Sequence, residues 1–469
     1  MKKIKLLFLS LLCVSCGNVS TKIEASLPAE MKDGIISLSV PPRAEGQQSA
    51  LLMTNEPMNE VRVGFIGLGM RGASAIYRYV QIEGARVTAL CDLEKDRVSA
   101  SQKVVTDAGF DVANEYVGEN SWKQLCEDPS VDLVYICTDW STHTAMAVYA
   151  MEHGKHVAIE VPAAMSINEC WQLVDTSEKT RKHCMMLENC VYDFFEMSAL
   201  NMAQHGLFGE VYYAEGGYIH NLDPFWKAYH NNWRLAYDQK FRGDVYPTHG
   251  IGPLCQVMNI HRGDRFDYVV SMDTKSFHGA KVGKELMDST SFANGEHTVS
   301  LLRTVNGKQI CIQHNVYAAR PYSRLYQLTG TEGFANKYPQ PALAIAGNKV
   351  SNDVENTDYD KLDAESFLPQ DAYEAMMEKY KPEFVKEIEE KAREVGGHGG
   401  MDYIMDYRLI YCMRNGLPLD QDVYDAAEWS CLTELSRLSL ENNSATVLVP
   451  DFTRGDWNKV NGFSYAMKK

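Results

Sequence analysis

Residues 61–72 read VRVGFIGLGMRG, and this stretch decides the fold of the first half of the chain. An apolar run of strand character, residues 61–66, passes directly into Gly67, Gly69 and Gly72, and a helix-compatible segment follows. Glycines with this spacing between a strand and a helix allow a tight turn, close approach of a pyrophosphate and an open helix N-terminus. The stretch therefore predicts the first unit of a Rossmann domain that binds a dinucleotide.

The next apolar run, residues 85–91, ends at Asp92, twenty positions after Gly72. A carboxylate at this place can accept hydrogen bonds from the ribose hydroxyls and would repel a 2′-phosphate. We therefore expect the cofactor to be NAD rather than NADP.

Strand and helix patterns alternate up to Asn189 and then change. Near-continuous apolar runs separated by helices are typical of a parallel sheet covered on both faces. After Asn189 a helix at 193–205 precedes antiparallel-looking runs, with a hairpin signal at Asn306-Gly307; these runs span 211–218, 268–273, 298–305, 309–317 and 326–330. The predicted fold class is α/β, with an N-terminal Rossmann parallel sheet and a second α+β domain on an open, mainly antiparallel sheet.

The charged stretch 374–393 is expected to be a solvated helix without a role.

The predicted organisation has four parts. The parts are a lipoprotein signal peptide at 1–16, a Pro- and Ser-containing tether at 17–57, an NAD-binding Rossmann domain at 58–189, and an α+β substrate domain at 190–469 whose C-terminal helices, 400–414 and 425–441, pack back across the domains.

The first sixteen residues are typical of a targeting segment, with lysines before an apolar run at 4–12. Ser15 and Cys16 then resemble the end of a bacterial lipoprotein signal, in which Cys16 becomes the lipidated first residue; ordinary signal cleavage is the alternative. One anchored chain end implies an exported, membrane-tethered protein. No acidic run follows Cys16 to indicate surface display, so we expect the periplasmic side.

Composition excludes several classes of partner and site. The formal net charge of −16 and the pI near 5.3 argue against nucleic acid, whose binding draws on basic side chains. Ten of the twelve cysteines lie outside the signal and have no CxxC spacing, so we interpret them as small buried hydrophobic residues. No cluster of histidines and cysteines has zinc spacing, and we predict no metal.

Several motifs resemble those of a known family. The Rossmann start and a strand ending in Glu-x-Pro resemble the Gfo/Idh/MocA oxidoreductases. Within that family, WSTH at 140–143, EVP at 160–162, EN at 188–189 and YPTHG at 246–250 resemble glycoside hydrolase family 109, described as NAD-using α-N-acetylgalactosaminidases. The wider family usually has a proton-transferring lysine where this chain has Val161, and the hydrolase subgroup shows the same substitution. The resemblance therefore favours a hydrolase over a sugar dehydrogenase.

The resemblance also implies site residues. Tyr246 and His249 lie in a motif that matches the family. The positions that the resemblance assigns to Arg234 and Tyr322 match less firmly, and Arg320 and Tyr317 are nearby alternatives. His249 and Tyr246, with Tyr218, are the expected catalytic residues. The residues expected to line NAD are Met70, Arg71, Asp92, Trp140, Ser141, Thr142, His143, Glu160, Val161 and Asn189, and those expected around the sugar are Tyr218, Arg234, Tyr246, His249 and Tyr322.

The implied reaction uses NAD to break a glycosidic bond. Oxidation at C3 acidifies the C2 proton, elimination across C1 and C2 expels the aglycone, water adds, and C3 is reduced again. Such a closed cycle suits an exported enzyme that keeps its NAD tightly bound, and it needs no pair of carboxylates. Which residue removes which proton stays open, as do the exact sugar and linkage.

Two other functions remain as alternatives. One is an NAD-dependent sugar or inositol oxidoreductase of the same fold, and the other is a carbohydrate-binding lipoprotein without activity. In every case the expected partner is a small carbohydrate or glycan terminus, and the membrane is reached only through the lipid anchor. The open sheet offers a surface on which two copies of the chain could form a homo-oligomer.

The Cys16→Ala substitution tests the anchor. We expect this variant to appear in the soluble fraction instead of the membrane fraction, with unchanged turnover, because Cys16 is far in sequence from the glycine-rich loop. Fractionation followed by immunoblotting measures the outcome. Retention of the variant on membranes would show that another segment holds the protein there.

Overall fold

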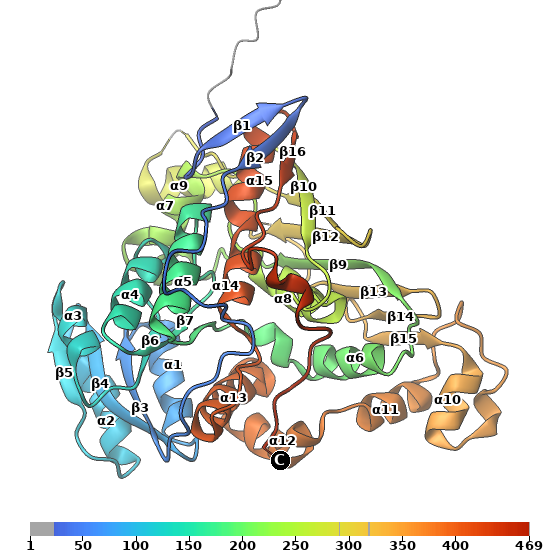
Figure 1. Ribbon diagram of the computed structural model, residues 1–469, viewed down its shortest axis with the longest axis horizontal. Helices are drawn as coiled ribbons and strands as arrows, with labels where there is room; N and C mark the ends of the chain where they lie inside the picture. The colour runs from blue at the N-terminus through green and yellow to red at the C-terminus, as the bar shows by residue number, and fades with distance from the viewer. Residues whose placement is uncertain (1–22, 290, 318, 469) are drawn as a thin grey trace, which may run out of the picture.

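The computed structural model describes residues 23–289, 291–317 and 319–468, and within them it forms two sheets (Figure 1). The smaller sheet has six strands in the order β5-β4-β3-β6-β7-β8, and the larger has ten in the order β1-β2-β16-β10-β11-β12-β9-β13-β14-β15. The predicted signal peptide and Cys16 lie outside the described residues. No helix in the described part of the chain is long and apolar enough to cross a membrane.

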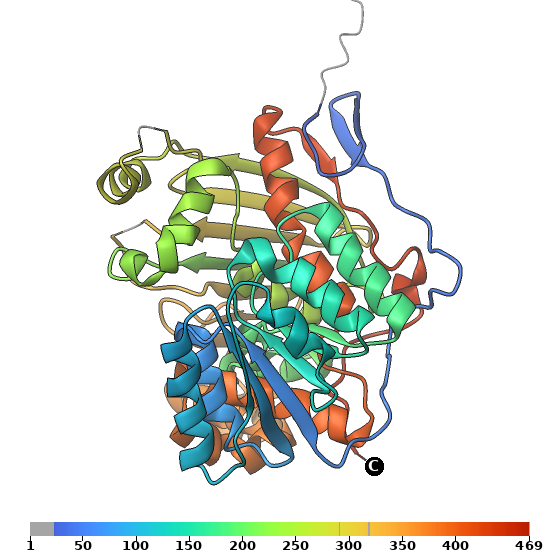
Figure 2. The ribbon, with the colours of Figure 1, turned by 90° about the vertical axis from the view of Figure 1, so that its left-hand side faces the viewer.

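The six-stranded sheet is parallel throughout, as predicted. Its inner strands are almost fully buried because helices cover both faces, which explains their unbroken apolar sequences (Figure 2). The strands are β3 (Val61–Ile66), β4 (Ala85–Asp92), β5 (Asn114–Val117), β6 (Leu133–Ile136), β7 (His156–Ile159) and β8 (Cys184–Met186), and the helices are α1 (Met70–Tyr79), α2 (Lys95–Asp107), α3 (Ser121–Glu127), α4 (Trp140–Glu152) and α5 (Ile167–Thr180).

The ten-stranded sheet is mainly antiparallel, again as predicted, but β12 pairs with β9 and β16 pairs with β2 in parallel. The predicted runs correspond to β9 (Val211–Ile219), β10 (Phe266–Asp273), β11 (Thr298–Thr304), β12 (Gln309–Asn315) and β13 (Tyr326–Gly330). The sequence did not reveal the shorter strands β1 (Ala29–Lys32), β2 (Ile35–Leu38), β14 (Gly333–Asn336), β15 (Ala342–Ile345) and β16 (Thr446–Leu448). Strands of three or four residues are too short to show an alternating pattern.

Helices join the two sheets. Helix α8 (Thr248–Met258) packs closely on β9, α13 (Met401–Asn415) packs on α1 and β3, and α14 (Val423–Ser430) packs on α5 and β8. The remaining helices are α6 (Phe194–Gln204), α7 (Trp233–Lys240), α9 (His278–Met287), α10 (Gly347–Val354), α11 (Gln370–Lys379), α12 (Glu383–Val395) and α15 (Leu432–Glu441).

Two stretches that the sequence predicts as single helices each form two helices in the structure. The stretch 374–393 falls on α11 and α12, which are separated at Pro382, because proline cannot continue the hydrogen bonding of the preceding helix. The stretch 425–441 falls on α14 and α15, which are separated at Cys431.

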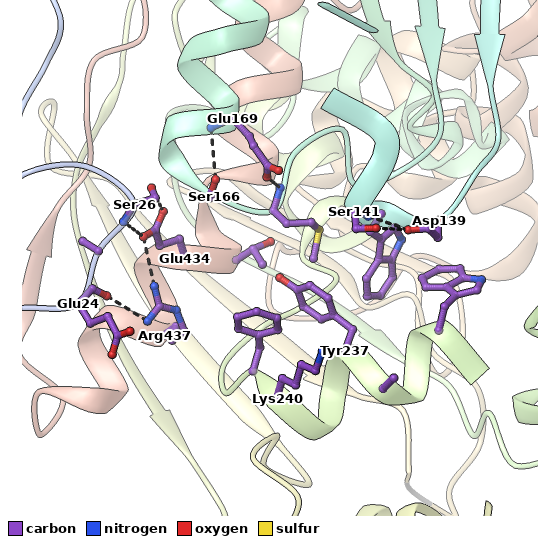
Figure 3. A pocket seen from close by; sticks show the side chains of 17 residues that line it. Glu24, Ser26, Asp139, Ser141, Ser166, Glu169, Tyr237, Lys240, Glu434 and Arg437 are labelled. Atoms are coloured by element: carbon purple, nitrogen blue, oxygen red, sulfur yellow. Dashed lines mark hydrogen bonds and ion pairs between the residues drawn. The ribbon is translucent and has the colours of Figure 1, made fainter. Parts of the chain in front are cut away.

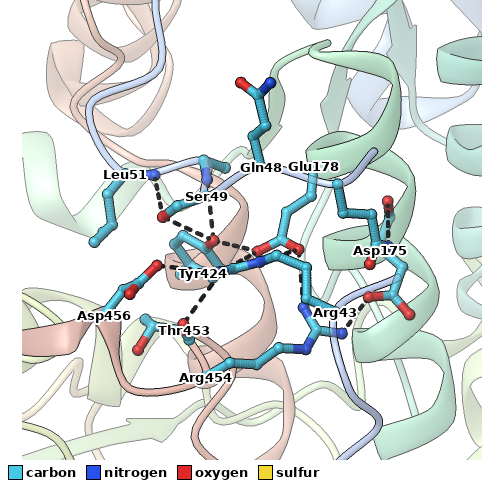
Figure 4. Close-up of polar contacts among 12 residues, drawn as sticks. Arg43, Gln48, Ser49, Leu51, Asp175, Glu178, Tyr424, Thr453, Arg454 and Asp456 are labelled. Atoms are coloured by element: carbon cyan, nitrogen blue, oxygen red, sulfur yellow. Dashed lines mark hydrogen bonds and ion pairs between the residues drawn. The ribbon is translucent and has the colours of Figure 1, made fainter. Parts of the chain in front are cut away.

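Residues 23–57 are not the free tether that the composition suggested. Strands β1 and β2 form a hairpin that extends the large sheet beside β16. Farther along, Arg43 reaches Glu178 of α5 at 2.9 Å and Asp456 near the C-terminus at 3.2 Å (Figure 4). The prediction was wrong because these contacts join residues far apart in sequence, which a composition count does not detect.

Glu178 is the centre of this network and is fully buried. It accepts hydrogen bonds from Arg43, Arg454 and Tyr424 (Figure 4). We expect Glu178→Gln to lower the free energy of unfolding by about 3 kcal/mol, because two guanidinium groups would lose their buried carboxylate. The matched control is Glu83→Gln on the exposed pair with Arg414, which should leave stability unchanged. Urea titration measures both, and equal effects would contradict the assignment.

Candidate active site

The cofactor edge begins at the glycine-rich loop between β3 and α1. A Cβ on Gly67, whose φ is +89°, would lie 2.7 Å from the carbonyl oxygen of Cys137, and one on Gly72 would lie 1.9 Å from the carbonyl of Gly67. At Gly69 the nearest atom is Nη1 of Arg97, at 4.0 Å. Two glycines thus permit close packing and the third faces open space before the helix N-terminus, where a pyrophosphate fits.

Asp92 lies beside this loop at the end of β4. One carboxylate oxygen accepts a hydrogen bond from the Leu68 N–H at 2.7 Å, and the other from the Glu94 N–H at 2.9 Å. These contacts hold the carboxylate where ribose hydroxyls bind in a Rossmann domain. Met70 is exposed at the start of α1. The open space at Gly69 and the fixed carboxylate of Asp92 together fit the pyrophosphate and the ribose of NAD.

Two expected cofactor residues, Arg71 and Asn189, meet at a buried carboxylate that the sequence did not indicate, Asp402 in the first turn of α13. Arg71 bonds to Glu160 at 3.0 Å and to Asp402 at 3.0 Å, while the Asn189 side chain donates to Asp402 at 2.5 Å. Burial alone would raise the pKa of Asp402, but the charge of Arg71 and the other cations holds that pKa well below its usual range. Asp402 is therefore an anion that joins α13 to the Rossmann edge.

The WSTH motif begins α4, and its members have different surroundings. Trp140 reaches the second domain and stacks on Tyr246, with ring centroids 5.7 Å apart. The ring nitrogens of His143 lie 2.8 Å from the carbonyl oxygen of Pro162 and 3.1 Å from that of Thr138, so this buried histidine holds two loops together. Val161 is buried, and Ser141 and Thr142 bond within the turn that starts the helix.

His249, the second residue of α8, forms a buried pair with Glu188, Nδ1 to Oε1 being 2.7 Å. Burial lowers the pKa of His249 to about 4. Burial opposes ionisation of Glu188, but His249, the Cys190 N–H and Arg324 outweigh it, and the pKa of Glu188 lies below its usual value. Because a carboxylate only accepts, Nδ1 carries the proton and Nε2 keeps its lone pair, so His249 is a base at neutral pH.

The rings of Tyr218, Tyr246 and His249 pack together. Their centroids are 5.0 to 5.3 Å apart, and the Arg234 guanidinium lies 4.5 Å from the centre of the Tyr246 ring. Arg234 is buried and donates one hydrogen bond, to the Tyr229 hydroxyl; its Nε and Nη2 have no partner among the described residues. Unpaired buried donors are costly, so these two groups are suited to bind oxygens of a ligand.

The two tyrosines are neutral phenols. The positive charge of Arg234 acts to lower the pKa of both tyrosines. Burial is the larger effect, however, and it raises the pKa of Tyr218 and places that of Tyr246 well above its ordinary value. Both hydroxyls are therefore hydrogen-bond donors, and His249 is left as the base of the group.

A cavity of about 330 Å³ opens beside these rings and is lined in part by Tyr218, His220 and Tyr322. Tyr322 is 40% exposed and lies edge-on to His220. The alternatives to Arg234 and Tyr322, which are Arg320 and Tyr317, lie elsewhere. The Tyr317 hydroxyl donates a hydrogen bond to buried Asp238 at 2.7 Å, and Arg320 is exposed on the surface. The structure thus brings Tyr322 and Tyr218 to one cavity.

His398 also lines this cavity, although it was not among the site residues expected from the sequence. His398 is the centre of GGHGG, residues 396–400, where all five φ angles lie between +47° and +115°. Its Nδ1 lies 2.9 Å from Asp402. A histidine flanked by glycine pairs was the available signal, because left-handed backbone favours glycine and such loops approach ligands closely. Arg324 and His220 gave no comparable signal.

Comparisons with known proteins agree along the whole described body. The model "Glycosyl hydrolase 109, C-terminal domain" matches residues 192–459, and "Oxidoreductase family, NAD-binding Rossmann fold" matches 61–188. Glycosyl hydrolase family 109 protein 1 of Phocaeicola vulgatus is 55% identical over 458 residues, 97% of each chain. The protein of that name from Bacteroides thetaiotaomicron is 57% identical over 438 residues, 92% of this chain and 93% of its own.

Solved structures share the fold at low identity. Levoglucosan dehydrogenase in complex with NADH and L-sorbose has a TM-score of 0.64 at 17% identity, over 84% of this chain and 100% of that one. Myo-inositol dehydrogenase from Lactobacillus casei, in complex with NAD(H) and myo-inositol, has a TM-score of 0.56 at 16% identity, over 84% of this chain and 99% of its own. The neighbours support the α/β architecture.

Glu188 is a positioning residue for His249, and Glu188→Gln tests that role. The variant keeps the acceptor but loses the charge, so we expect enzymatic turnover to fall by about tenfold or more. Because Glu188 raises the pKa of His249, the acid limb of the pH profile should also move to lower pH. Glu215→Gln on β9 is the control, and an unshifted profile would refute the role.

Proposed function

This chain belongs to glycosyl hydrolase family 109, and from that premise we propose that it removes terminal α-linked N-acetylgalactosamine from glycans with the help of tightly bound NAD. The observation that carries the proposal is the neutral His249 base, held by Glu188 at 2.7 Å beside a Rossmann edge that fits NAD. Val161 supports it, because the lysine that a sugar dehydrogenase of this fold uses for proton transfer is absent from the Glu-x-Pro motif.

Arg71, Asp92, Glu160 and Asn189 are the residues that would hold NAD. The chemistry that NAD supplies when bound is reversible removal of hydride from C3 of the sugar, which makes the hydrogen on C2 acidic. Nε2 of His249 accepts a proton from the sugar and holds it until the bond at C1 is broken. Its imidazolium form is stabilised at Nδ1 by the Glu188 carboxylate.

Other side chains orient the sugar and assist the leaving group. The Tyr246 hydroxyl donates a hydrogen bond to a sugar oxygen, while the Tyr218 hydroxyl lines the cavity paired with Nδ1 of His220 at 2.8 Å. The free Nε and Nη2 of Arg234 bind ring substituents. His398 faces the same cavity with a carboxylate partner, so it is placed to give a proton to the departing oxygen.

Direct displacement by two carboxylates has little support in this cavity. Asp193 is the one carboxylate among the described residues that line it, and it pairs with Lys337 at 2.9 Å. Nearby Glu160 and Asp402 are occupied by Arg71. Ordinary glycosidases need one carboxyl group as acid and a second as nucleophile or base.

We also propose that the protein is exported and anchored through Cys16. Six residues separate Cys16 from Ile23, where the described body begins, and they span at most about 25 Å. The proposed anchor would thus hold the enzyme close to the membrane surface, because residues 23–57 are packed on the body instead of extending the tether.

Two measurements on one substrate test the function. Purified protein is incubated with an aryl α-N-acetylgalactosaminide that carries deuterium at C2, and phenol release and NADH absorbance are followed together. We expect phenol release without net NADH, and loss of deuterium to solvent, because the base removes the C2 proton. His249→Ala should reduce turnover by about a hundredfold or more while NAD stays bound.

Each contrary result identifies another function. NADH that accumulates in proportion to substrate would indicate a sugar oxidoreductase. Phenol release with full retention of deuterium would indicate direct displacement at C1. Absence of turnover together with sugar binding would indicate a carbohydrate-binding protein.

A further inference from the structure

A second cavity, of about 650 Å³, shares no lining residue with the cavity beside Tyr218 (Figure 3). We call it the accessory cavity; helix α7, the first turns of α4 and α5, and α15 surround it. It is about twice the size of the cavity lined by Tyr218 and His398, and Trp140 and Ser141, which are expected to line NAD, lie at its α4 side. A concave site of this size is in the range that binds small ligands.

Helix α7 lies between the catalytic rings and the accessory cavity. Arg234 and Asp238 point inwards and are buried, Arg234 lying against the catalytic rings. Trp233 and Tyr237 on the opposite face, and Phe241 directly after the end of the helix, line the accessory cavity. The Trp140 ring lies edge-on to those of Trp233 and Tyr237, with centroids 4.9 and 5.3 Å apart, so it joins the three rings into one aromatic strip.

The strip is only partly covered. Trp233 and Tyr237 are half-buried, Phe241 is 37% exposed, and the rings of Tyr237 and Phe241 lie 4.4 Å apart. Aromatic surface left in water costs free energy that a core position would recover. An aromatic strip that faces a hollow is therefore suited to stack against a ligand.

The remaining walls are polar and carry both charges. Lys240 extends over the cavity and has no ion-pair or hydrogen-bond partner among the described side chains, and Ser141 is exposed at the start of α4 (Figure 3). Glu169 lies on the α5 side, where burial raises the pKa of its carboxyl group. One flat apolar wall opposite scattered hydrogen-bonding groups matches a neutral pyranose, which has apolar C–H faces and a rim of hydroxyls.

We propose that the accessory cavity is a second carbohydrate-binding subsite, which binds neutral sugar units of a glycan other than the terminal residue that is cleaved. The proposal rests on the proposed function for the choice of sugar as ligand. Trp140 links the two sites, because it lines the accessory cavity and stacks on Tyr246 in the active site.

Binding is measured first, without any cleavage. The full chain is titrated calorimetrically with lactose and with N-acetyllactosamine, neither of which carries a terminal α-N-acetylgalactosamine. We expect saturable binding of at least one, weakened about fivefold or more by Phe241→Ala. Two variants should bind as the parent does: Phe277→Ala, which removes a phenylalanine that is 64% exposed elsewhere, and Tyr322→Ala in the catalytic cavity.

Either of two results overturns the subsite. One is the absence of saturable binding for both disaccharides. The other is weakening by Tyr322→Ala but not by Phe241→Ala, which would place the sugar in the catalytic cavity. This titration does not depend on hydrolysis, so it decides the subsite even if the proposed function fails.

Kinetics then test whether the subsite serves the same glycan. For a trisaccharide that ends in α-N-acetylgalactosamine, we expect Phe241→Ala to raise KM about fivefold or more at unchanged kcat. The ratio of kcat/KM for the trisaccharide to that for the aryl glycoside should fall accordingly. An equal change for both substrates would show that Phe241 acts on the catalytic site instead, and would refute the subsite.

Discussion

The buried carboxylate of Asp402 is the interaction on which the active site depends. It belongs to α13, far along the chain, yet Arg71, Asn189 and His398 all bond to it. Without an anion at that point, the half-buried Arg71 and the glycine-rich loop that carries His398 would have no common partner. Since α13 also packs on α1 and β3, the same contact fixes the second domain against the cofactor edge.

Burial then determines how the titratable groups can act. It lowers the pKa of His249 and raises those of Tyr218 and Tyr246, so one side chain becomes a base and two become donors. The opposing charges, Glu188 for the histidine and Arg234 for the tyrosines, are too weak to reverse these directions. The division of roles thus comes from the depth of the site as much as from residue type.

Helix α7 connects catalysis with recognition of a larger substrate. Its inner face places the unpaired donors of Arg234 near the catalytic rings, and its outer face carries the aromatic strip. A helix with ligand-facing groups on both sides would let one rigid element align the cleaved sugar and its neighbours. Trp140, which contacts both regions, provides the physical link.

The sequence by itself determined the Rossmann unit and the open second sheet, because these depend on local spacing and periodicity, and its resemblance to a known family indicated Tyr246 and His249. The tertiary structure alone decided that residues 23–57 pack on the body, since Arg43 and Glu178 are 135 positions apart. It also decided that Asp402 and His398 join the site and that His143 holds two loops. Those assignments depend on contacts between distant segments and on burial, and neither quantity is present in a local pattern of residues.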